Sequence, residues 1–237
     1  MSSASSADAP RAAAVIVAGG SGRRMGGAVR KQYMEVGGTP VLLRAVMPFV
    51  DHLGIGRVVV VLPPEDVDAP PSWLAALPVV VVAGGAERGD SVWNGLLATP
   101  EDAPAVLVHD GARPFVSAAI INRVLDACSE TGAIAAVQMT DTVKEVGPDG
   151  VIRGTPDRER LWRAQTPQGF PRAALVRAYQ RARAEGVAAT DDAAIFERYE
   201  GPVRVVAGSE RNIKVTRPTD LRVAEAIALA PDAEAGE

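Results

Sequence analysis

Apolar residues along the chain gather in short unbroken runs rather than in alternating apolar and polar positions. Strands that are buried on both faces have this pattern, and such strands belong to parallel sheets covered by helices. The sequence therefore predicts five buried strands: AAAVIVA at 12–18, RVVVVL at 57–62, VVVVA at 79–83, AVLVHD at 105–110 and AIAAVQM at 133–139.

Helical patterns fill the segments between these runs. Thr39 and Pro40 are typical of a helix N-cap followed by proline at the first helical position. The apolar residues that follow at helical spacing share one face: Val41, Leu42, Ala45, Val46 and Phe49. Further helices are predicted at 90–97, 117–131, 171–185, 191–199 and 218–230. This alternation indicates an α/β fold with a doubly wound, mostly parallel sheet, whose ligands lie beyond the carboxyl ends of the strands.

One segment, 139–161, interrupts the alternation. It is polar, contains the turn sequence GPDG and has only short β-like pieces. We expect it to form a β-arm that protrudes from the domain, where it can carry partner contacts. The rest of residues 12–230 is expected to form a single domain, with flexible tails at 1–11 and 231–237.

Composition excludes several classes of protein. The 237 residues are 47% hydrophobic and 23% charged, which is ordinary for a soluble globular enzyme. A net charge of −4 argues against general nucleic-acid binding, and the early apolar run is too short for a membrane span. The single cysteine, Cys128, excludes an internal disulfide and fits a reducing compartment. We therefore expect a cytoplasmic protein without nucleic-acid or membrane partners.

The loop after the first predicted strand carries the clearest chemistry. It reads GGSGRRMGGAVRK at 19–31, so that glycines surround Arg23, Arg24 and Lys31. Glycines allow backbone N–H groups to approach an anion, and separated cations suit a triphosphate. The loop matches neither the P-loop pattern nor the dinucleotide pattern, because it has no Gly-Lys-Ser/Thr and no G-x-G-x-x-G. A nucleoside triphosphate is the predicted ligand, and a solvated basic turn is the alternative.

Six further segments accompany this loop in a fixed order. They are VAGGAERGDSVWNGL at 82–96, VHDGARPFV at 108–116, TDTVKEV at 140–146, DRERLWRAQTPQGF at 157–170, TDDAAIFE at 190–197 and NIKVTRPTDL at 212–221. In order and spacing the chain resembles the 2-C-methyl-D-erythritol 4-phosphate cytidylyltransferases of non-mevalonate isoprenoid biosynthesis, over about residues 12–230. The resemblance implies a Rossmann-like nucleotidyltransferase fold. It also implies transfer of CMP from CTP to methylerythritol phosphate, with Mg²⁺ or another divalent cation as cofactor. The polar segment 139–161 leads us to expect a homodimer as well.

Three positions depart from the pattern of that family. Val17 and Gly19 stand where proline and alanine are more common, and Arg30 replaces the usual proline before the lysine. The loop entrance is closer to that of the ribitol-5-phosphate cytidylyltransferases. A ribitol-5-phosphate or other sugar-phosphate nucleotidyltransferase therefore remains an alternative, and a catalytically silent nucleotide-binding protein is a third. The set of cations expected around an acceptor phosphate argues against the silent protein.

The resemblance also implies roles for individual residues. Arg24 and Lys31 would stabilise the transition state, while Arg158 and Lys214 would hold the attacking phosphate in line. CTP would be bound by Ala18, Gly19, Gly20, Gly85, Ser91, Asp110 and Gly111. The acceptor would be bound by Arg113, Thr142, Arg158, Thr166, Thr190 and Lys214. The metal is expected to be held mainly by CTP phosphates and water, with Asp110 as the one candidate protein ligand.

Some residues in these segments have competing interpretations. Ser91 could be an N-cap-like hydroxyl instead of a CTP contact, and His109 is interpreted as structural. Asp191 and Asp192 could form an acid/base pair, but beside Thr190 they are more typical of a helix start. We expect the 139–161 arm to complete the site of a two-fold partner, with Arg158 acting in trans.

Overall fold

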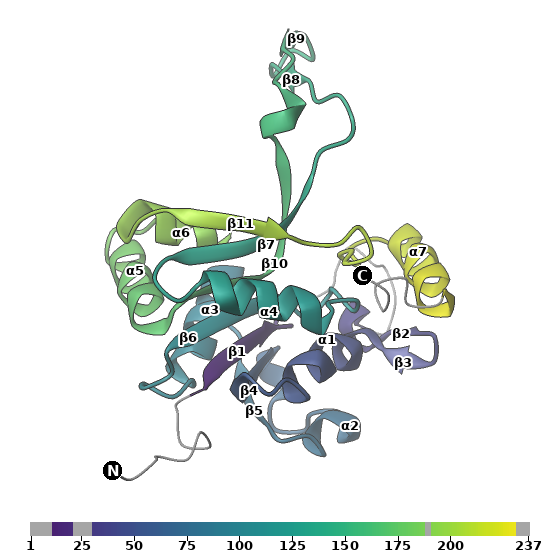
Figure 1. Cartoon of the computed structure of the whole chain (residues 1–237). Coiled ribbons are helices and arrows are strands. Elements are labelled where there is room, and N and C mark those ends of the chain that lie inside the picture. The colour runs from purple at the N-terminus through teal and green to yellow at the C-terminus, as the bar shows by residue number, and fades with distance from the viewer. Residues whose placement is uncertain (1–10, 21–29, 188–190, 231–237) are drawn as a thin grey trace, which may run out of the picture.

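A computed structural model of the chain describes residues 11–20, 30–187 and 191–230. Its centre is a seven-stranded sheet in the order β11-β7-β10-β6-β1-β4-β5 (Figure 1). The strands are β1 Ala12–Val17, β4 Ile55–Leu62, β5 Val79–Ala83, β6 Ala105–Asp110, β7 Gly132–Gln138, β10 Trp162–Pro171 and β11 Val203–Ala207. All neighbouring pairs are parallel except those of β10, which is antiparallel to both β6 and β7.

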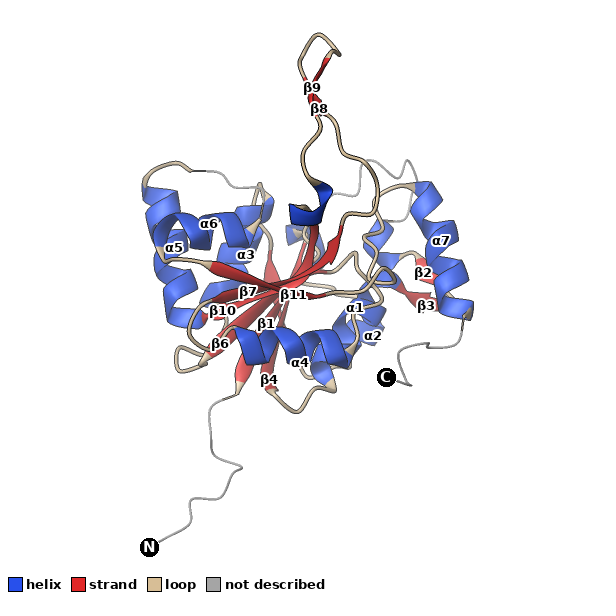
Figure 2. Ribbon diagram, turned by 45° about the horizontal axis from the view of Figure 1, so that its top comes forward, coloured by secondary structure: helices blue, strands red, loops and turns tan. Residues whose placement is uncertain are grey.

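Helices cover both faces of this sheet (Figure 2). They are α1 Val41–Val50, α2 Ser72–Ala75, α3 Arg88–Leu97, α4 Ala118–Ala127, α5 Arg172–Ala184, α6 Asp192–Tyr199 and α7 Pro218–Leu229. Along β1, Ala14 and Ile16 pack in the cluster that contains α1 and α4, whereas Ala13 and Val15 pack in the cluster that contains α3, α5 and α6. Because both faces of β1 are buried, its sequence is apolar at every position. The predicted doubly wound sheet is confirmed. No helix within the described ranges has the length and apolar character needed to cross a membrane.

Two strands of the seven-stranded sheet lie outside the five predicted runs. The first is β10, which carries Gln165, Thr166 and Gln168 in its buried part. These polar side chains are satisfied by tertiary hydrogen bonds, so the apolar signal of a central strand is missing. The second, β11, is an edge strand with partly exposed residues, which weakens its apolar pattern in the same way.

The predicted cap of α1 is wrong in its details. Thr39 is not the N-cap, because it pairs with Val36 in a small hairpin of β2 Glu35–Val36 and β3 Thr39–Pro40. Gly37 and Gly38, both at positive φ of 55° and 70°, form its two-residue turn. Pro40 occupies the N-cap position instead, and α1 begins at Val41.

The predicted β-arm is confirmed. It contains the hairpin of β8 Glu145–Val146 and β9 Ile152–Gly154 and projects from the body of the domain (Figure 1). A short 3₁₀ turn, Arg158–Arg160, leads the chain back into β10. Apolar side chains of the arm and its base are exposed: Val146 53%, Ile152 58% and Trp162 46%.

Candidate active site

A cavity of about 530 Å³ opens at the carboxyl ends of β1, β4, β5 and β6. We call it the strand-end pocket. It brings together nine residues that the sequence assigned to the site: Ala18, Gly19, Gly20, Lys31, Gly85, Ser91, Asp110, Gly111 and Lys214. They come from distant parts of the chain and meet because parallel strands end at the same edge of the sheet.

Ser91 holds the wall of this pocket in place. It lies inside α3, whose N-cap is Glu87, so Ser91 is not the cap residue. Its hydroxyl donates to the carbonyl of Glu87 at 3.1 Å and accepts from the amide of Gly85 at 3.1 Å. A Cβ on Gly85 would lie 2.2 Å from the Cβ of Asp90, so only glycine fits this turn. Ser91 therefore fixes the backbone of the loop that faces the glycines after β1.

Both backbone groups of Ala18 make hydrogen bonds within the fold. Its N–H donates to the carbonyl of Val61 at 2.8 Å, while its carbonyl accepts from Nε2 of Gln32 at 3.1 Å. A carbonyl oxygen has two lone pairs, so base recognition at Ala18 would use this oxygen and not the amide. Gln32 lines the pocket and is only 2% exposed, and its Oε1 has no partner among the described residues. The sequence analysis missed Gln32, although it directly follows Lys31.

Cations surround the carboxylate of Asp110. Lys214 Nζ lies 2.8 Å from Oδ2, Arg88 Nε lies 3.2 Å from Oδ1, and Arg113 Nε lies 3.7 Å from Oδ2. Burial by itself raises the pKa of Asp110, but the charges of Arg88, Lys214 and Arg113 outweigh it and hold the pKa well below its usual range. Asp110 is therefore ionised. The sequence analysis did not single out Arg88, which also lines the pocket.

This donor set suits a metal that is held mainly by its substrate. Within the ranges that the structure describes, no cluster of three or more His, Cys, Asp or Glu side chains could hold a metal ion. Both oxygens of Asp110 already contact cations. Glu65 and Glu87 also line the pocket, but with Asp110 they do not form such a cluster. A hard ion such as Mg²⁺ would therefore depend mainly on phosphate oxygens and water for its ligands.

His109 lies beneath the pocket as a neutral hydrogen-bonding group. The amide of Asp110 donates to the hydroxyl of Thr166 at 3.0 Å, and Thr166 lies 2.9 Å from Nδ1 of His109. With the hydroxyl donating to Nδ1, Nε2–H donates to the carbonyl of Arg113 at 3.1 Å. Burial lowers the pKa of His109 to about 4. The structural interpretation of His109 agrees with this geometry, and Thr166 is a buried part of the same network.

Other expected acceptor residues do not line the strand-end pocket. The guanidinium of Arg113 donates to the carbonyl of Asn212 at 2.8 Å. Thr142 and Arg158 are exposed on the arm, where Arg158 donates to the carbonyl of Thr140 at 2.9 Å. Arg24 and Thr190 lie outside the described residues. Among the described acceptor residues, Lys214 is the one that a single chain brings to the pocket.

The pair at the start of α6 has helix-start geometry. Asp191 is the N-cap, and its Oδ1 accepts from the amide of Ala194 at 3.0 Å. Asp192 lies in the first turn, is fully buried, and contacts Arg88. This confirms the helix-start interpretation.

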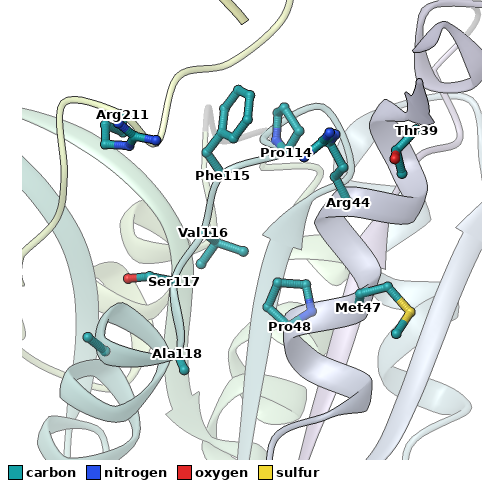
Figure 3. A pocket seen from close by; sticks show the side chains of 11 residues that line it. Thr39, Arg44, Met47, Pro48, Pro114, Phe115, Val116, Ser117, Ala118 and Arg211 are labelled. Carbon is teal, nitrogen blue, oxygen red and sulfur yellow. The ribbon is translucent and has the colours of Figure 1, made fainter. Parts of the chain in front are cut away.

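A second hollow, of about 580 Å³, lies between α1 and the start of α4 (Figure 3). We call it the α1–α4 hollow. Its walls are mainly apolar, with Met47, Pro48 and Phe115, and Arg44 and Arg211 also line it. None of the residues that the sequence assigned to the site lines this hollow. The strand-end pocket is therefore the candidate active site.

A mostly parallel sheet with a cationic, glycine-lined pocket at its carboxyl edge is the arrangement expected of an α/β nucleotidyltransferase. The sequence profile of 2-C-methyl-D-erythritol 4-phosphate cytidylyltransferase matches residues 12–229, and the chain belongs to that family. A protein of that name from Symbiobacterium thermophilum is 46% identical over 214 residues, which cover 89% of this chain and 90% of the relative. Another, from Syntrophus aciditrophicus, is 45% identical over 224 residues, covering 92% and 95% of the two chains.

Solved structures agree with this membership. The 4-diphosphocytidyl-2C-methyl-D-erythritol synthase of Anaerococcus prevotii superposes with a TM-score of 0.84 at 30% identity, over 94% of this chain and 98% of the other. The 2-C-methyl-D-erythritol 4-phosphate cytidylyltransferase of Thermus thermophilus has a TM-score of 0.79 at 35% identity, over 93% and 100%. The chain is thus a cytidylyltransferase, which confirms the predicted enzyme class.

Proposed function

We propose that the chain transfers CMP from CTP to 2-C-methyl-D-erythritol 4-phosphate in isoprenoid precursor biosynthesis. The products are 4-diphosphocytidyl-2-C-methyl-D-erythritol and pyrophosphate. The observation that carries the proposal is the strand-end pocket of a chain of this family, which is lined by the cations Lys31, Arg88 and Lys214 and by Asp110. Separated cations around one carboxylate suit two phosphate-bearing substrates that must meet.

In this reaction an oxygen of the acceptor phosphate attacks the α-phosphorus of CTP. The bond from that phosphorus to the bridging oxygen breaks, and pyrophosphate leaves. The protein needs to position two anions and to stabilise the charge that grows around one phosphorus. Lys31 would stabilise that charge, Lys214 would orient the acceptor phosphate, and Asp110 would accept from ribose hydroxyls. Mg²⁺, held mainly by the triphosphate and water, would supply further charge neutralisation.

Pyrophosphate release tests this proposal. The purified protein is incubated with CTP and Mg²⁺, and with either 2-C-methyl-D-erythritol 4-phosphate or ribitol 5-phosphate. Release with the first acceptor is expected, and omission of the acceptor is the control. Faster release with ribitol 5-phosphate would establish the alternative acceptor, and no release with either would favour a silent nucleotide-binding protein.

We further propose that the active unit is a homodimer formed through the 139–161 arm. Thr142 and Arg158, both expected at the acceptor phosphate, are exposed on this arm. The arm also exposes Val146 and Ile152, and it points away from the body of its own domain (Figure 1). A two-fold partner can receive such an arm, and isologous exchange then gives two equal sites. A cytoplasmic location goes with this proposal, since the buried Cys128 is a free thiol.

Mixing two inactive variants tests the exchange of arms. An Arg158→Ala chain and a Lys31→Ala chain are each expected to be inactive as homodimers. In a mixed dimer, one site carries both changes and the other carries neither. Random pairing should therefore restore roughly a quarter of the wild-type activity if the sites work independently. No recovery, despite subunit exchange shown by differently tagged chains, would mean that Arg158 does not act in trans.

A further inference from the structure

A continuous series of ionic contacts runs from the start of α6 to the strand-end pocket. Both terminal guanidinium nitrogens of Arg88 contact the carboxylate of Asp192, Nη1 to Oδ1 at 3.2 Å and Nη2 to Oδ2 at 2.9 Å. The Nε of the same Arg88 lies 3.2 Å from Oδ1 of Asp110. The other oxygen of Asp110 lies 2.8 Å from Nζ of Lys214. Charges alternate along the series, so each group has an opposite neighbour.

Asp192 is the inner end of this series. Its side chain is completely buried, at 0% exposure, and its Oδ1 also accepts from the hydroxyl of Tyr179 at 2.5 Å. The amide oxygen of Gln168 accepts from the backbone N–H groups of Asp192 and Ala193 at 3.2 and 3.0 Å, which holds the start of α6. Burying a carboxylate requires such compensation, and apolar residues of similar volume often serve stability as well. Stability alone therefore does not account for Asp192.

The geometry of Arg88 shows what Asp192 adds. Arg88 belongs to the first turn of α3, lines the pocket and retains 29% side-chain exposure, so its long side chain has open space on the pocket side. A fork of two parallel contacts fixes the plane of a guanidinium in a way that one contact does not. With both Nη atoms on Asp192, the Nε is aimed at Asp110. The burial of Arg88 works against its charge, but Asp192 and Asp110 outweigh that effect and raise its pKa.

We propose that Asp192 is a positioning residue for the acceptor half of the site. By holding Arg88, it keeps the carboxylate of Asp110 in place, and Asp110 in turn locates the ammonium of Lys214. The role deepens the proposed function, on which it rests. A small misplacement of a positioning cation can cost up to about 10²-fold in rate, because the reacting groups no longer align.

Kinetics of Asp192→Asn, Arg88→Gln and the double variant test this role. Asp192→Asn should lower kcat/KM for the acceptor by on the order of 10-fold or more, with a smaller change in KM for CTP. Because Asp192 acts through Arg88, the double variant should be no less active than Arg88→Gln alone. Independent, multiplying losses in the double variant, or unchanged kinetics in Asp192→Asn, would overturn the proposal.

Thermal stability separates positioning from a purely structural role. Arg88→Gln leaves the buried Asp192 without its cation, so Tm should fall, and the added Asp192→Asn change should restore part of that fall. Activity should not return with stability. The matched control is Asp191→Asn, the same substitution on the preceding residue, which caps α6 and whose carboxylate accepts from the amide of Ala194 and from Gln168 instead of pairing with Arg88. Its kinetics should stay within about twofold of wild type.

A crystal structure of Asp192→Asn gives a readout that needs no turnover. Arg88 Nε should have left Asp110, and Lys214 should have moved from its present place. Both groups at their wild-type positions would overturn the proposal even if the wild-type enzyme used a different acceptor. Wild-type turnover, measured alongside, tests the proposed function separately.

Discussion

The strand-end pocket and the α1–α4 hollow have similar volumes, about 530 and 580 Å³, yet their cations are used in different ways. In the pocket, Arg88 and Lys214 contact the side chain of Asp110, at 3.2 and 2.8 Å. In the hollow, Arg44 donates to the carbonyl of Val36 at 2.8 Å and Arg211 donates to that of Ile227 at 3.1 Å. The latter contact satisfies a carbonyl in the last turn of α7.

This difference shows why volume does not identify a site. A cation that pairs with a side-chain carboxylate can redirect part of its interaction to a phosphate. A cation that satisfies backbone carbonyls is part of the fold, since losing it leaves polar groups without partners. The position of each cavity adds to this contrast, because strand ends converge on the pocket whereas helices enclose the hollow.

The largest expected difference between the two cavities comes from removing one cation from each. Lys31→Ala should lower kcat by on the order of 10²-fold or more, because it removes a preorganised stabilising group, while the protein stays folded. Arg44→Ala, the control from the hollow, should leave kcat near wild type. Steady-state kinetics of both variants, with circular dichroism to check folding, make the measurement. Wild-type turnover in a folded Lys31→Ala protein would remove Lys31 from the mechanism.

Low pH should reduce the free energy of unfolding through the buried His109, which lies beneath the pocket. Its pKa is about 4 in the folded protein and 6.5 in an ordinary environment, because burial disfavours the charged form. Between these pH values His109 is protonated in the unfolded chain but neutral in the folded chain. The free energy of unfolding therefore decreases as pH falls from about 6.5 to 4. The pKa difference corresponds to about 3 kcal/mol in the free energy of unfolding. Asp110, whose pKa is held low, adds its own loss only below about pH 4.

Urea unfolding at a series of pH values measures this loss. His109→Gln should reduce the slope of stability between pH 6.5 and 4, whatever its stability at pH 7. The control is His52→Gln, which removes a half-buried histidine from the loop after α1. An equal slope in wild type and His109→Gln would show that His109 is not the group that takes up the proton.

The sequence predicted the parallel strands and the location of the pocket, but not every residue in it. Unbroken apolar runs identify β1, β4, β5, β6 and β7, because helices cover the sheet on both faces and apolar side chains are therefore needed on both sides of a strand. Parallel strands then bring their carboxyl ends together, so the glycine loop and the segment after β6 had to meet. Strand β10 has no unbroken apolar run, because polar residues such as Gln168 occupy buried positions in it.

The contacts that the sequence did not predict join residues far apart along the chain. Arg88 and Asp192 are 104 positions apart, and no sequence motif containing one of them predicts its contact with the other. Gln32 gains its role from the carbonyl of Ala18, which only the folded chain brings near. The arm is predictable as a polar excursion, whereas the place of Arg158 at a partner's site belongs to the proposed homodimer. Sequence patterns therefore report burial and loop chemistry better than long-range pairing.

Selectivity among nucleoside triphosphates also distinguishes the two cavities, since only the strand-end pocket is expected to bind the base. CTP should be preferred over UTP, because uracil has an acceptor where cytosine has an amino donor. The second lone pair of an acceptor such as the carbonyl of Ala18 would then face another acceptor, at a cost of roughly 1–3 kcal/mol, or about 5-fold to 150-fold in kcat/KM. ATP and GTP, as larger bases, serve as controls and should be used poorly. Equal kcat/KM for CTP and UTP would contradict a cytosine-reading pocket.

The smallest expected effect comes from Ser117 at the rim of the α1–α4 hollow. Ser117 is the N-cap of α4, and its hydroxyl accepts from the amide of Ile120 at 3.4 Å. Ser117→Ala should lower the free energy of unfolding by about 1 kcal/mol, as the loss of a cap generally does. Because α4 packs against β7, β10 and β11 and contributes no residue to the lining of the pocket, kcat and KM for both substrates should not change. Urea unfolding and steady-state kinetics on the same preparation measure both quantities. A change in KM for either substrate without a loss of stability would show that the hollow takes part in substrate binding, and the contrast between the two cavities would fail.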